Sequence, residues 1–230
     1  MATASEHHLD KILLPYGLTA SDYPGSGRQY QGHIGSRSIH IYTRSITTGK
    51  RSDSPGRYSG HSVEIYLDSS LHTRAQLNAQ SSGLSGMLNR APQNLDTTAV
   101  PYLENKGLLF TALDRQWGTA LAESTQELLA ATAEQPGFRF LRFQPEALHL
   151  AAQLHWQEIT TEKLDFWISA LTSLASHAET LEPAQVTASE SKQERNMRLA
   201  RGSTLKRLRF FGVTVGLSIV LIVMIIFRSL

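Results

Sequence analysis

Apolar and polar residues alternate along several stretches early in the chain, which is the period of β-strands that bury one face. The stretches cover residues 37–46, 62–67 and 71–79. Their apolar positions are Ile39, Ile41, Val63, Ile65, Leu67, Leu71, Ala75 and Leu77. We therefore expect strands within residues 28–79, interrupted by a loop at the polar, turn-rich segment 47–60.

A second pair of strands is predicted at 138–144 and 147–156, joined by a short turn. The later strand places its leucines and Trp156 on one face, and His149 and His155 on the other. These two histidines are six residues apart, which is about 20 Å along a strand, too far for them to hold one metal ion.

A period of 3.6 residues predicts helices at 114–132 and after Thr160, which is a good N-cap residue. The core face of the first is expected to hold Trp117, Ala120, Leu121, Leu128 and Ala131. The second has a continuous apolar stripe, and Pro183 ends it. The stripe comprises Leu164, Trp167, Ile168, Leu171, Leu174, Ala175, Ala178 and Leu181. These elements predict an α+β fold, an antiparallel sheet with two packed helices.

An uninterrupted apolar run covers residues 210–227 and holds no charged residue, proline, asparagine or glutamine. As a helix the run is about 27 Å long, close to the thickness of a bilayer's hydrocarbon core. A buried helix of a soluble core is the alternative, but Arg209 and Arg228 border the run. We therefore expect one C-terminal transmembrane helix.

Cations gather immediately before this run. Residues 183–209 hold seven Lys or Arg against two Glu, whereas residues 1–182 hold 14 against 18 acidic residues. The positive-inside tendency then predicts a cytoplasmic N-terminal part and a single-pass, tail-anchored topology. The cations are either topology determinants or contacts for anionic lipid headgroups. Those nearest the run are Arg201, Lys206, Arg207 and Arg209.

The expected organisation has four parts: a short helix and loop at 1–27, a cytoplasmic α+β domain at 28–182, a polar and then basic juxtamembrane tether at 183–209, and the transmembrane helix at 210–227. Within that helix Gly212 and Gly216 form a Gly-x-x-x-Gly pair, which lets two helix backbones approach closely. The pair is either an ordinary feature of membrane helices or a contact with a second copy or a larger membrane complex.

Composition and spacing argue against several chemistries. Cysteine is absent, which rules out disulfides, thiolate nucleophiles and cysteine-based metal sites. The acidic balance of residues 1–182 argues against nucleic acid as a partner. The histidines have no metal-ligand spacing, and only cross-strand pairing can bring those at 33, 40, 61 and 72 together. Ser85 lacks the spacing of a nucleophile elbow. No catalytic residue, metal or cofactor is therefore expected.

These observations favour a non-enzymatic protein of a membrane, whose cytoplasmic domain acts as an adaptor, assembly factor or accessory subunit of a membrane complex. The alternative is a membrane-tethered domain that binds a small molecule or a lipid headgroup. The cysteine-free composition and the lack of eukaryotic signals point to a bacterial inner membrane.

Overall fold

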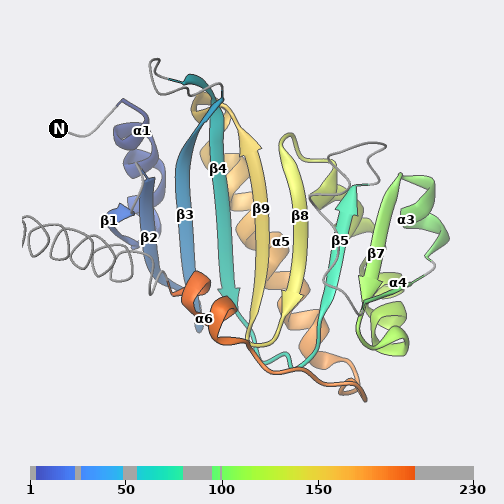
Figure 1. Ribbon diagram of the computed structural model, residues 1–230. Helices are drawn as coiled ribbons and strands as arrows, with labels where there is room; N and C mark the ends of the chain where they lie inside the picture. Colours follow the sequence, from blue (N-terminus) through green and yellow to red (C-terminus); the bar gives the residue numbers. More distant parts are fainter. Residues whose placement is uncertain (1–3, 24–26, 49–55, 80–94, 99, 200–230) are drawn as a thin grey trace, which may run out of the picture. The chain divides into compact units, whose positions relative to one another are not determined.

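The structure, a computed structural model, describes residues 4–23, 27–48, 56–79, 95–98 and 100–199. The chain divides into two compact units, Met1–Glu190 and Ser191–Leu230. The described part of the first unit contains a nine-stranded antiparallel sheet with several helices (Figure 1). This confirms the expected α+β class and the antiparallel sheet. The apolar run 210–227 lies outside the described residues.

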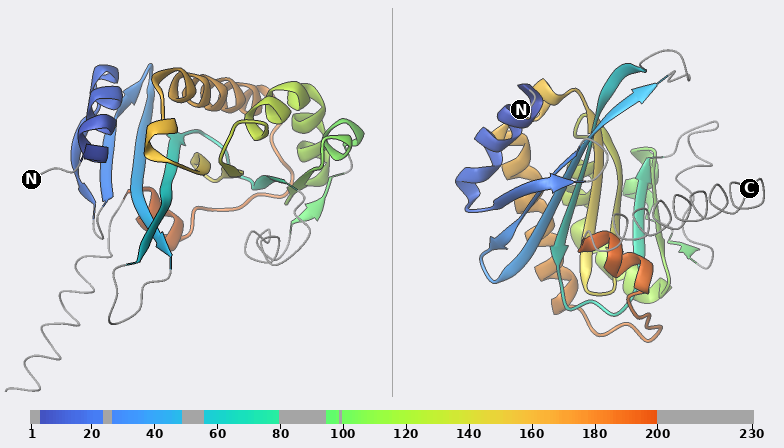
Figure 2. Two further views of the ribbon diagram at one scale, coloured as in Figure 1. Left: turned by 90° about the horizontal axis from the view of Figure 1, so that it is seen from above. Right: turned by 60° about the vertical axis from the view of Figure 1, so that its left-hand side comes forward.

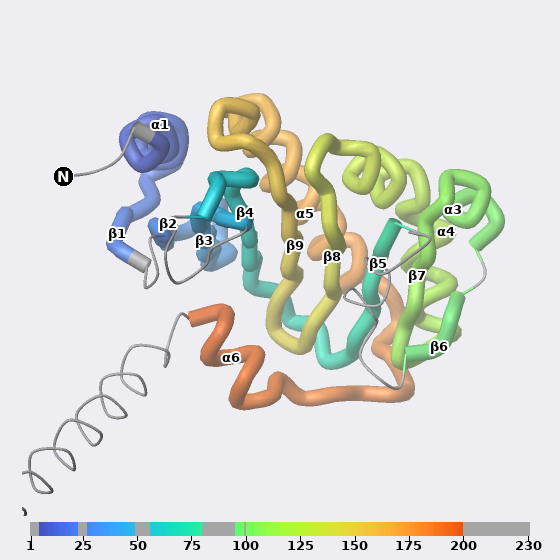
Figure 3. The backbone as a smooth tube through the Cα atoms, turned by 45° about the horizontal axis from the view of Figure 1, so that its top comes forward, coloured from blue at the N-terminus to red at the C-terminus, as the bar shows by residue number. Residues whose placement is uncertain are grey.

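The order of strands in the sheet is β1-β2-β3-β4-β9-β8-β5-β7-β6. The strands are β1 (Thr19–Tyr23), β2 (Gly27–Ile34), β3 (Arg37–Thr48), β4 (Arg57–Asp68), β5 (Ala75–Ala79), β6 (Asp96–Thr97), β7 (Leu108–Ala112), β8 (Phe138–Gln144) and β9 (Ala147–Leu154). The β8–β9 hairpin lies between β4 and β5, which are consecutive in the chain but not neighbours in the sheet (Figure 3). Within the described sheet, this hairpin therefore pairs with both halves, with β4 on one side and β5 on the other.

Helices α1, α4 and α5 lie on the same side of the sheet (Figure 2, left). The first unit contains α1 (Ala4–Leu13), α3 (Pro101–Asn105), α4 (Arg115–Ala133), α5 (Thr161–Thr180) and the short 3-10 helices η1 (Leu14–Tyr16) and η2 (Trp156–Glu158). Within the described part of the chain, no helix combines the length and apolarity needed to cross a membrane.

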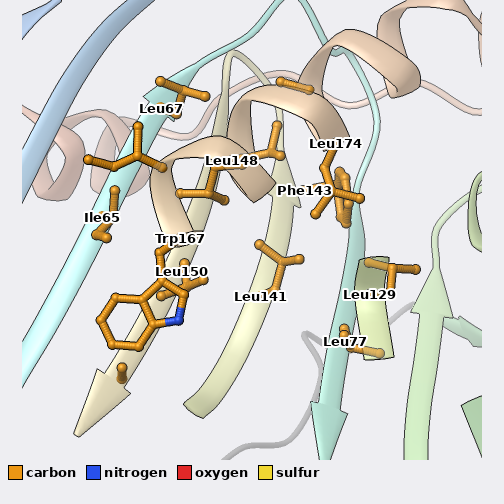
Figure 4. Close-up of a cluster of buried hydrophobic side chains, with 14 of the residues drawn as sticks. Ile65, Leu67, Leu77, Leu129, Leu141, Phe143, Leu148, Leu150, Trp167 and Leu174 are labelled. Atoms are coloured by element: carbon orange, nitrogen blue, oxygen red, sulfur yellow. The ribbon is translucent and has the colours of Figure 1, made fainter. Parts of the chain in front are cut away.

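The core lies between this helical layer and the sheet. Every residue of the predicted α5 stripe from Leu164 to Ala178 is buried, which confirms that part of the pattern. Figure 4 shows Trp167 and Leu174 of α5 among the leucines of β8 and β9. Thr160 caps α5 as expected, because its side chain accepts a hydrogen bond from the Lys163 backbone N–H.

Two strand predictions differ from the structure. The segment 47–60 is a strand at both ends, because β3 continues to Thr48 and pairs with β4 from Arg57, past a register shift after Ile46. Residues 49–55 lie outside the described part of the chain. The stretch 71–79 forms a strand only from Ala75, although Leu71 is still buried. Backbone pairing decides both boundaries, and it does not depend on apolar alternation.

The second unit is described only through Leu199. Its helix α6 (Lys192–Arg198) begins with a capping box, in which Ser191 Oγ accepts from the Glu194 N–H and a Glu194 carboxylate oxygen accepts from the Ser191 N–H. The beginning of the predicted basic segment is therefore helical.

Candidate functional site

Five aromatic and imidazole rings meet at the end of the sheet where β4 begins and β9 ends. In order of contact they are His8, Trp156, His155, Tyr58 and His61, and we call them the ring row. Their successive centroid distances are 5.2, 5.8, 5.2 and 5.4 Å. The rings meet because β4 pairs with β9, placing His61 opposite Leu154, directly before His155 and η2.

His61 lies at the inner end of the ring row and is only 4% exposed. Its Nδ1 lies 2.6 Å from the Tyr58 hydroxyl, and its Nε2 lies 3.2 Å from Ser45 Oγ, the cross-strand partner on β3. Burial lowers the pKa of His61, and the neighbouring His155 lowers it further, against the opposing effect of Glu6. The imidazole is therefore neutral at neutral pH.

The hydrogen bonds assign roles to these groups. The Tyr58 hydroxyl accepts a hydrogen bond from the Trp156 backbone N–H at 3.2 Å. When the hydroxyl donates its own proton to His61 Nδ1, the tyrosine hydroxyl, the backbone N–H and the imidazole each have a partner. The Nε2–H of His61 then donates to Ser45 Oγ. An imidazole in this tautomer is no base toward Ser45. The arrangement is therefore suited to holding hydroxyl groups rather than to activating a serine nucleophile.

A small hollow of about 90 Å³ lies beside His61, between α1 and strands β2, β3 and β4. Its lining residues are Ser5, Glu6, Leu9, Gly27, Arg28, Thr43, Ser45 and His61. Three hydroxyl groups, one imidazole and one charge of each sign thus face a space that holds only a small polar group.

Arg28 is tied to carboxylates at one side of this hollow. Its Nε and Nη2 donate to the two oxygens of Asp10 at 3.1 and 2.7 Å, and Nη1 donates to Asp22 at 2.8 Å. Tyr30 also donates to Asp10, at 2.8 Å. Burial alone raises the pKa of Asp10, but the bonds from Arg28 and Tyr30 bring it below its ordinary value. Arg28 is thus already neutralised, which makes the hollow a poor anion site.

A second cluster occupies the sheet face that alternates with the core positions of β4, β8 and β9. His149 stacks on Tyr66, with centroids 4.0 Å apart and planes at 14°, and Phe140 meets its edge at 5.1 Å. Its Nε2 lies 3.3 Å from a Glu64 carboxylate oxygen. The Arg142 guanidinium lies 4.0 Å from the centre of the Phe140 ring. We call these five residues the outer-face cluster.

The electrostatics of the outer-face cluster follow from burial. Burial lowers the pKa of His149, and Glu64 opposes this shift. Burial also disfavours ionised Glu64, but His149, Tyr66 and Arg44 together hold its pKa below its ordinary value. A neutral imidazole beside an ionised carboxylate makes this cluster a structural and pH-sensitive element rather than a ligand pocket.

A third feature is a hollow of about 200 Å³ between the first turn of α4 and the segment after α5. Asp114 accepts from the Trp117 N–H and caps α4, while its other oxygen accepts from the N–H groups of Gln185 and Val186 at 2.6 and 3.0 Å. Since both oxygens of Asp114 are engaged, we interpret this residue as a structural clamp.

The residues singled out from the sequence as sites lie outside the described residues. They are Gly212, Gly216, Arg201, Lys206, Arg207 and Arg209, and their roles stay predictions. In the part of the chain that is described, no three His, Asp or Glu side chains are placed to hold a metal ion. The ring row had no local signal, because its members come from three distant segments. Only the cross-strand position of His61 hinted at it.

One solved structure resembles this fold. It is the crystal structure of the mycobacterial trehalose monomycolate transport factor A, TtfA, with a TM-score of 0.53 and 7% sequence identity. The match covers 80% of this chain and 100% of that chain. No family model matches the chain, and no curated protein does. At this identity the likeness concerns the fold alone.

Proposed function

We propose that this chain is a non-enzymatic accessory factor of a bacterial membrane complex, anchored by residues 210–227 with its α+β domain in the cytoplasm. The observation that carries the proposal is the apolar run 210–227 with the cations that precede it. The fold likeness to TtfA, which extends over the whole of that chain, is compatible with an accessory role. TtfA is named a transport factor rather than an enzyme. The apolar run and the cations before it supply the membrane attachment in this chain.

Reciprocal co-purification tests the proposal. The full chain, tagged at its N-terminus, is extracted in a mild detergent, and the proteins that remain bound are identified by mass spectrometry. We expect the same membrane proteins in repeated preparations, and we expect each of them, when tagged, to recover this chain. The proposal fails if nothing is enriched over a control in which an unrelated tagged domain carries an unrelated single-pass anchor.

The anchor contact is tested by replacing both Gly212 and Gly216 with Ile. Branched side chains at these positions keep the helix apolar but prevent close approach of a second helix. We expect crosslinked dimers or recovered partners to decrease strongly. Leu217→Ile, a substitution of equal apolarity outside the glycine row, is the matched control. Equal recovery from all three proteins would assign the glycines no contact.

Orientation is tested with sealed right-side-out vesicles. The proposal expects added protease to leave the domain intact until the vesicles are opened by detergent. Digestion in sealed vesicles would place the domain on the outer side of the membrane.

A second candidate function is binding of a lipid headgroup or small molecule. The observation that favours it is the hollow beside Ser45 and His61, where hydroxyl, imidazole and charged groups converge on a space left open between α1 and the sheet. Convergent polar groups in a concave site are the usual mark of small-ligand binding.

A further inference from the structure

We propose that the hollow beside Ser45 and His61 binds the hydroxyl groups of a neutral polyol, such as a sugar. The inference rests on the second candidate function and names its ligand class. The groups that carry it are Ser5, Glu6, Arg28, Thr43, Ser45 and His61.

The lining matches a ligand whose groups both donate and accept hydrogen bonds. Hydroxyl side chains do both, the Glu6 carboxylate only accepts, and the Arg28 guanidinium only donates. Thr43 Oγ1 donates to the backbone oxygen of Arg28 at 3.3 Å, so its lone pairs are the part that can accept from a ligand. Alcohol groups on neighbouring carbons can satisfy such a mixed set, because each of them turns to donate or accept.

The volume limits what can enter. A space of about 90 Å³ corresponds to roughly three waters, at the ~30 Å³ that each takes in the liquid. Neighbouring hydroxyls of one sugar ring can replace such waters with their own hydrogen bonds. An acyl chain or a complete disaccharide does not fit, so the rest of the ligand must extend out of the hollow.

The charges around the hollow disfavour an anionic headgroup such as a phosphate. Arg28 is held by both Asp10 and Asp22, and Glu6 adds a further carboxylate to the lining. Entry of a phosphate would bring a negative charge toward three carboxylates and one guanidinium that is already paired. The ring of His61 adds no compensating charge at neutral pH. A neutral ligand avoids this repulsion.

The site is also held in position before any ligand binds. Tyr58 and Ser45 hold the two nitrogens of His61, and the Trp156 backbone holds Tyr58. The rings of Tyr58 and Trp156 are half-buried, and that of His155 is exposed. A fixed polar group beside partly open rings suits the combination of hydroxyl groups and apolar ring faces that a sugar presents.

The test is a ligand titration of the full chain, monitored through the NMR signals of the His61 imidazole. The detergent is a polyoxyethylene or zwitterionic one, because alkyl glycosides carry the proposed ligand chemistry. Trehalose is the probe, and inorganic phosphate and ethanolamine are the comparison ligands. We expect trehalose to shift the His61 signals saturably, and neither comparison ligand to do so at equal concentration. Saturable shifts with phosphate or ethanolamine, and none with trehalose, would overturn the proposal.

Two serine variants make the test specific. Ser45→Ala removes a lining hydroxyl, and we expect it to weaken trehalose binding up to about tenfold, the effect of one lost hydrogen bond. Ser62→Ala is the matched control, because Ser62 follows His61 on β4 and therefore points to the opposite face of the sheet. Equal affinities of the two variants would overturn the assignment. Equal thermal midpoints of the two variants exclude unfolding as the cause of weaker binding. Glu6→Gln is a second variant of a residue that lines the hollow.

The source of the polyol is decided with vesicles. Tighter binding to vesicles that contain a neutral glycolipid than to plain vesicles, lost in Ser45→Ala, identifies a lipid headgroup. Binding of free trehalose with no preference for those vesicles identifies a soluble sugar. Both results support the polyol site. If trehalose does not bind while partners still co-purify with the chain, the polyol inference fails and the accessory function stands. If partners are lost while trehalose still binds, the accessory function fails and the polyol inference stands.

Discussion

Asp114 connects three parts of the domain through one carboxylate. It caps α4 through the Trp117 N–H and holds the backbone of Gln185 and Val186, more than 70 residues later. The Trp117 N–H, followed by those of Val186 and Gln185, keeps the pKa of Asp114 below its ordinary value. Its sequence context predicts a helix start, but the second partner could not be inferred from local residues.

We expect Asp114→Asn to lower the free energy of unfolding by about 1–3 kcal/mol at pH 7, since it weakens a cap and two charge-assisted bonds. The wild-type advantage depends on an ionised carboxylate whose folded pKa is depressed. It is therefore present above the unfolded pKa of about 3.9, and is lost as pH falls through the lower folded pKa. Urea unfolding at pH 7 and pH 3 measures this. Asp96→Asn, at an exposed aspartate, is the control, and equal effects would contradict the clamp.

The second residue-scale prediction concerns His149. Burial depresses its folded pKa, so the unfolded chain binds the extra proton first as pH falls below about 6.5, and stability decreases there. We expect His149→Phe to reduce the loss of stability between pH 7 and 5.5. Because the pKa of His61 is lowered too, the slope should shrink rather than vanish. Denaturant midpoints across that range check this, with the exposed His72→Gln as control. An unchanged slope would contradict it.

At the scale of elements, α5 was predictable and α4 was only partly so. The stripe of α5 is long and leucine-rich, so its period identified the buried face. In α4 the buried positions include Trp117, Leu121, Thr125 and Leu129, whereas the expected Ala120 is exposed and Leu128 only partly buried. Alanine-rich helices carry little apolar contrast between faces, so the tertiary contacts decide which face is buried.

Gly118 is a position at which α4 packs closely against β7. A Cβ at this position would lie 2.3 Å from the Cβ of Ala112 on β7, so α4 packs directly against the strand. In an exposed helix Gly→Ala is stabilising by about 1 kcal/mol. Here we expect Gly118→Ala to destabilise by about 1–3 kcal/mol through overpacking.

The rescue experiment for Gly118→Ala is Ala112→Gly, which removes the opposing methyl group. We expect the double variant to recover part of the loss, with a favourable coupling energy measured by urea unfolding. A stabilised Gly118→Ala protein, or strictly additive effects, would show that the close contact does not decide packing at this position.

At the scale of the whole molecule, the segment after α5 returns to the domain before the second unit begins. Thr73 Oγ1 donates to the Val186 oxygen at 3.0 Å, and the Ala188 N–H donates to the His72 oxygen at 2.6 Å. The segment can be followed along the lower edge of the domain in Figure 3. Residues 185–188 therefore belong to the packed domain, although the polar composition of the segment suggested a tether.

We therefore expect a chain that ends at Glu190 to be more stable than one that ends at Glu182. The shorter chain loses the bonds to Asp114, His72 and Thr73, and its thermal midpoint should fall by roughly 4–8 °C. Asp114→Asn should cost less in the shorter chain, where only the cap of α4 is left to lose. Equal midpoints for the two chains would support the boundary at residue 182 that the sequence predicts.

The sequence by itself determined the α+β class, the α5 stripe and the local strand patterns, because burying one face imposes a period of 2 or 3.6 on consecutive residues. It also carries the prediction of a membrane anchor, since that depends only on the length and apolarity of one run. The tertiary structure alone decided that β8–β9 lies between β4 and β5, that α4 rests on Ala112 through Gly118, and that His61, Tyr58 and Trp156 meet. Strand pairing and the packing of helices on the sheet create these contacts between separate elements, and neither leaves a periodic signal in the sequence.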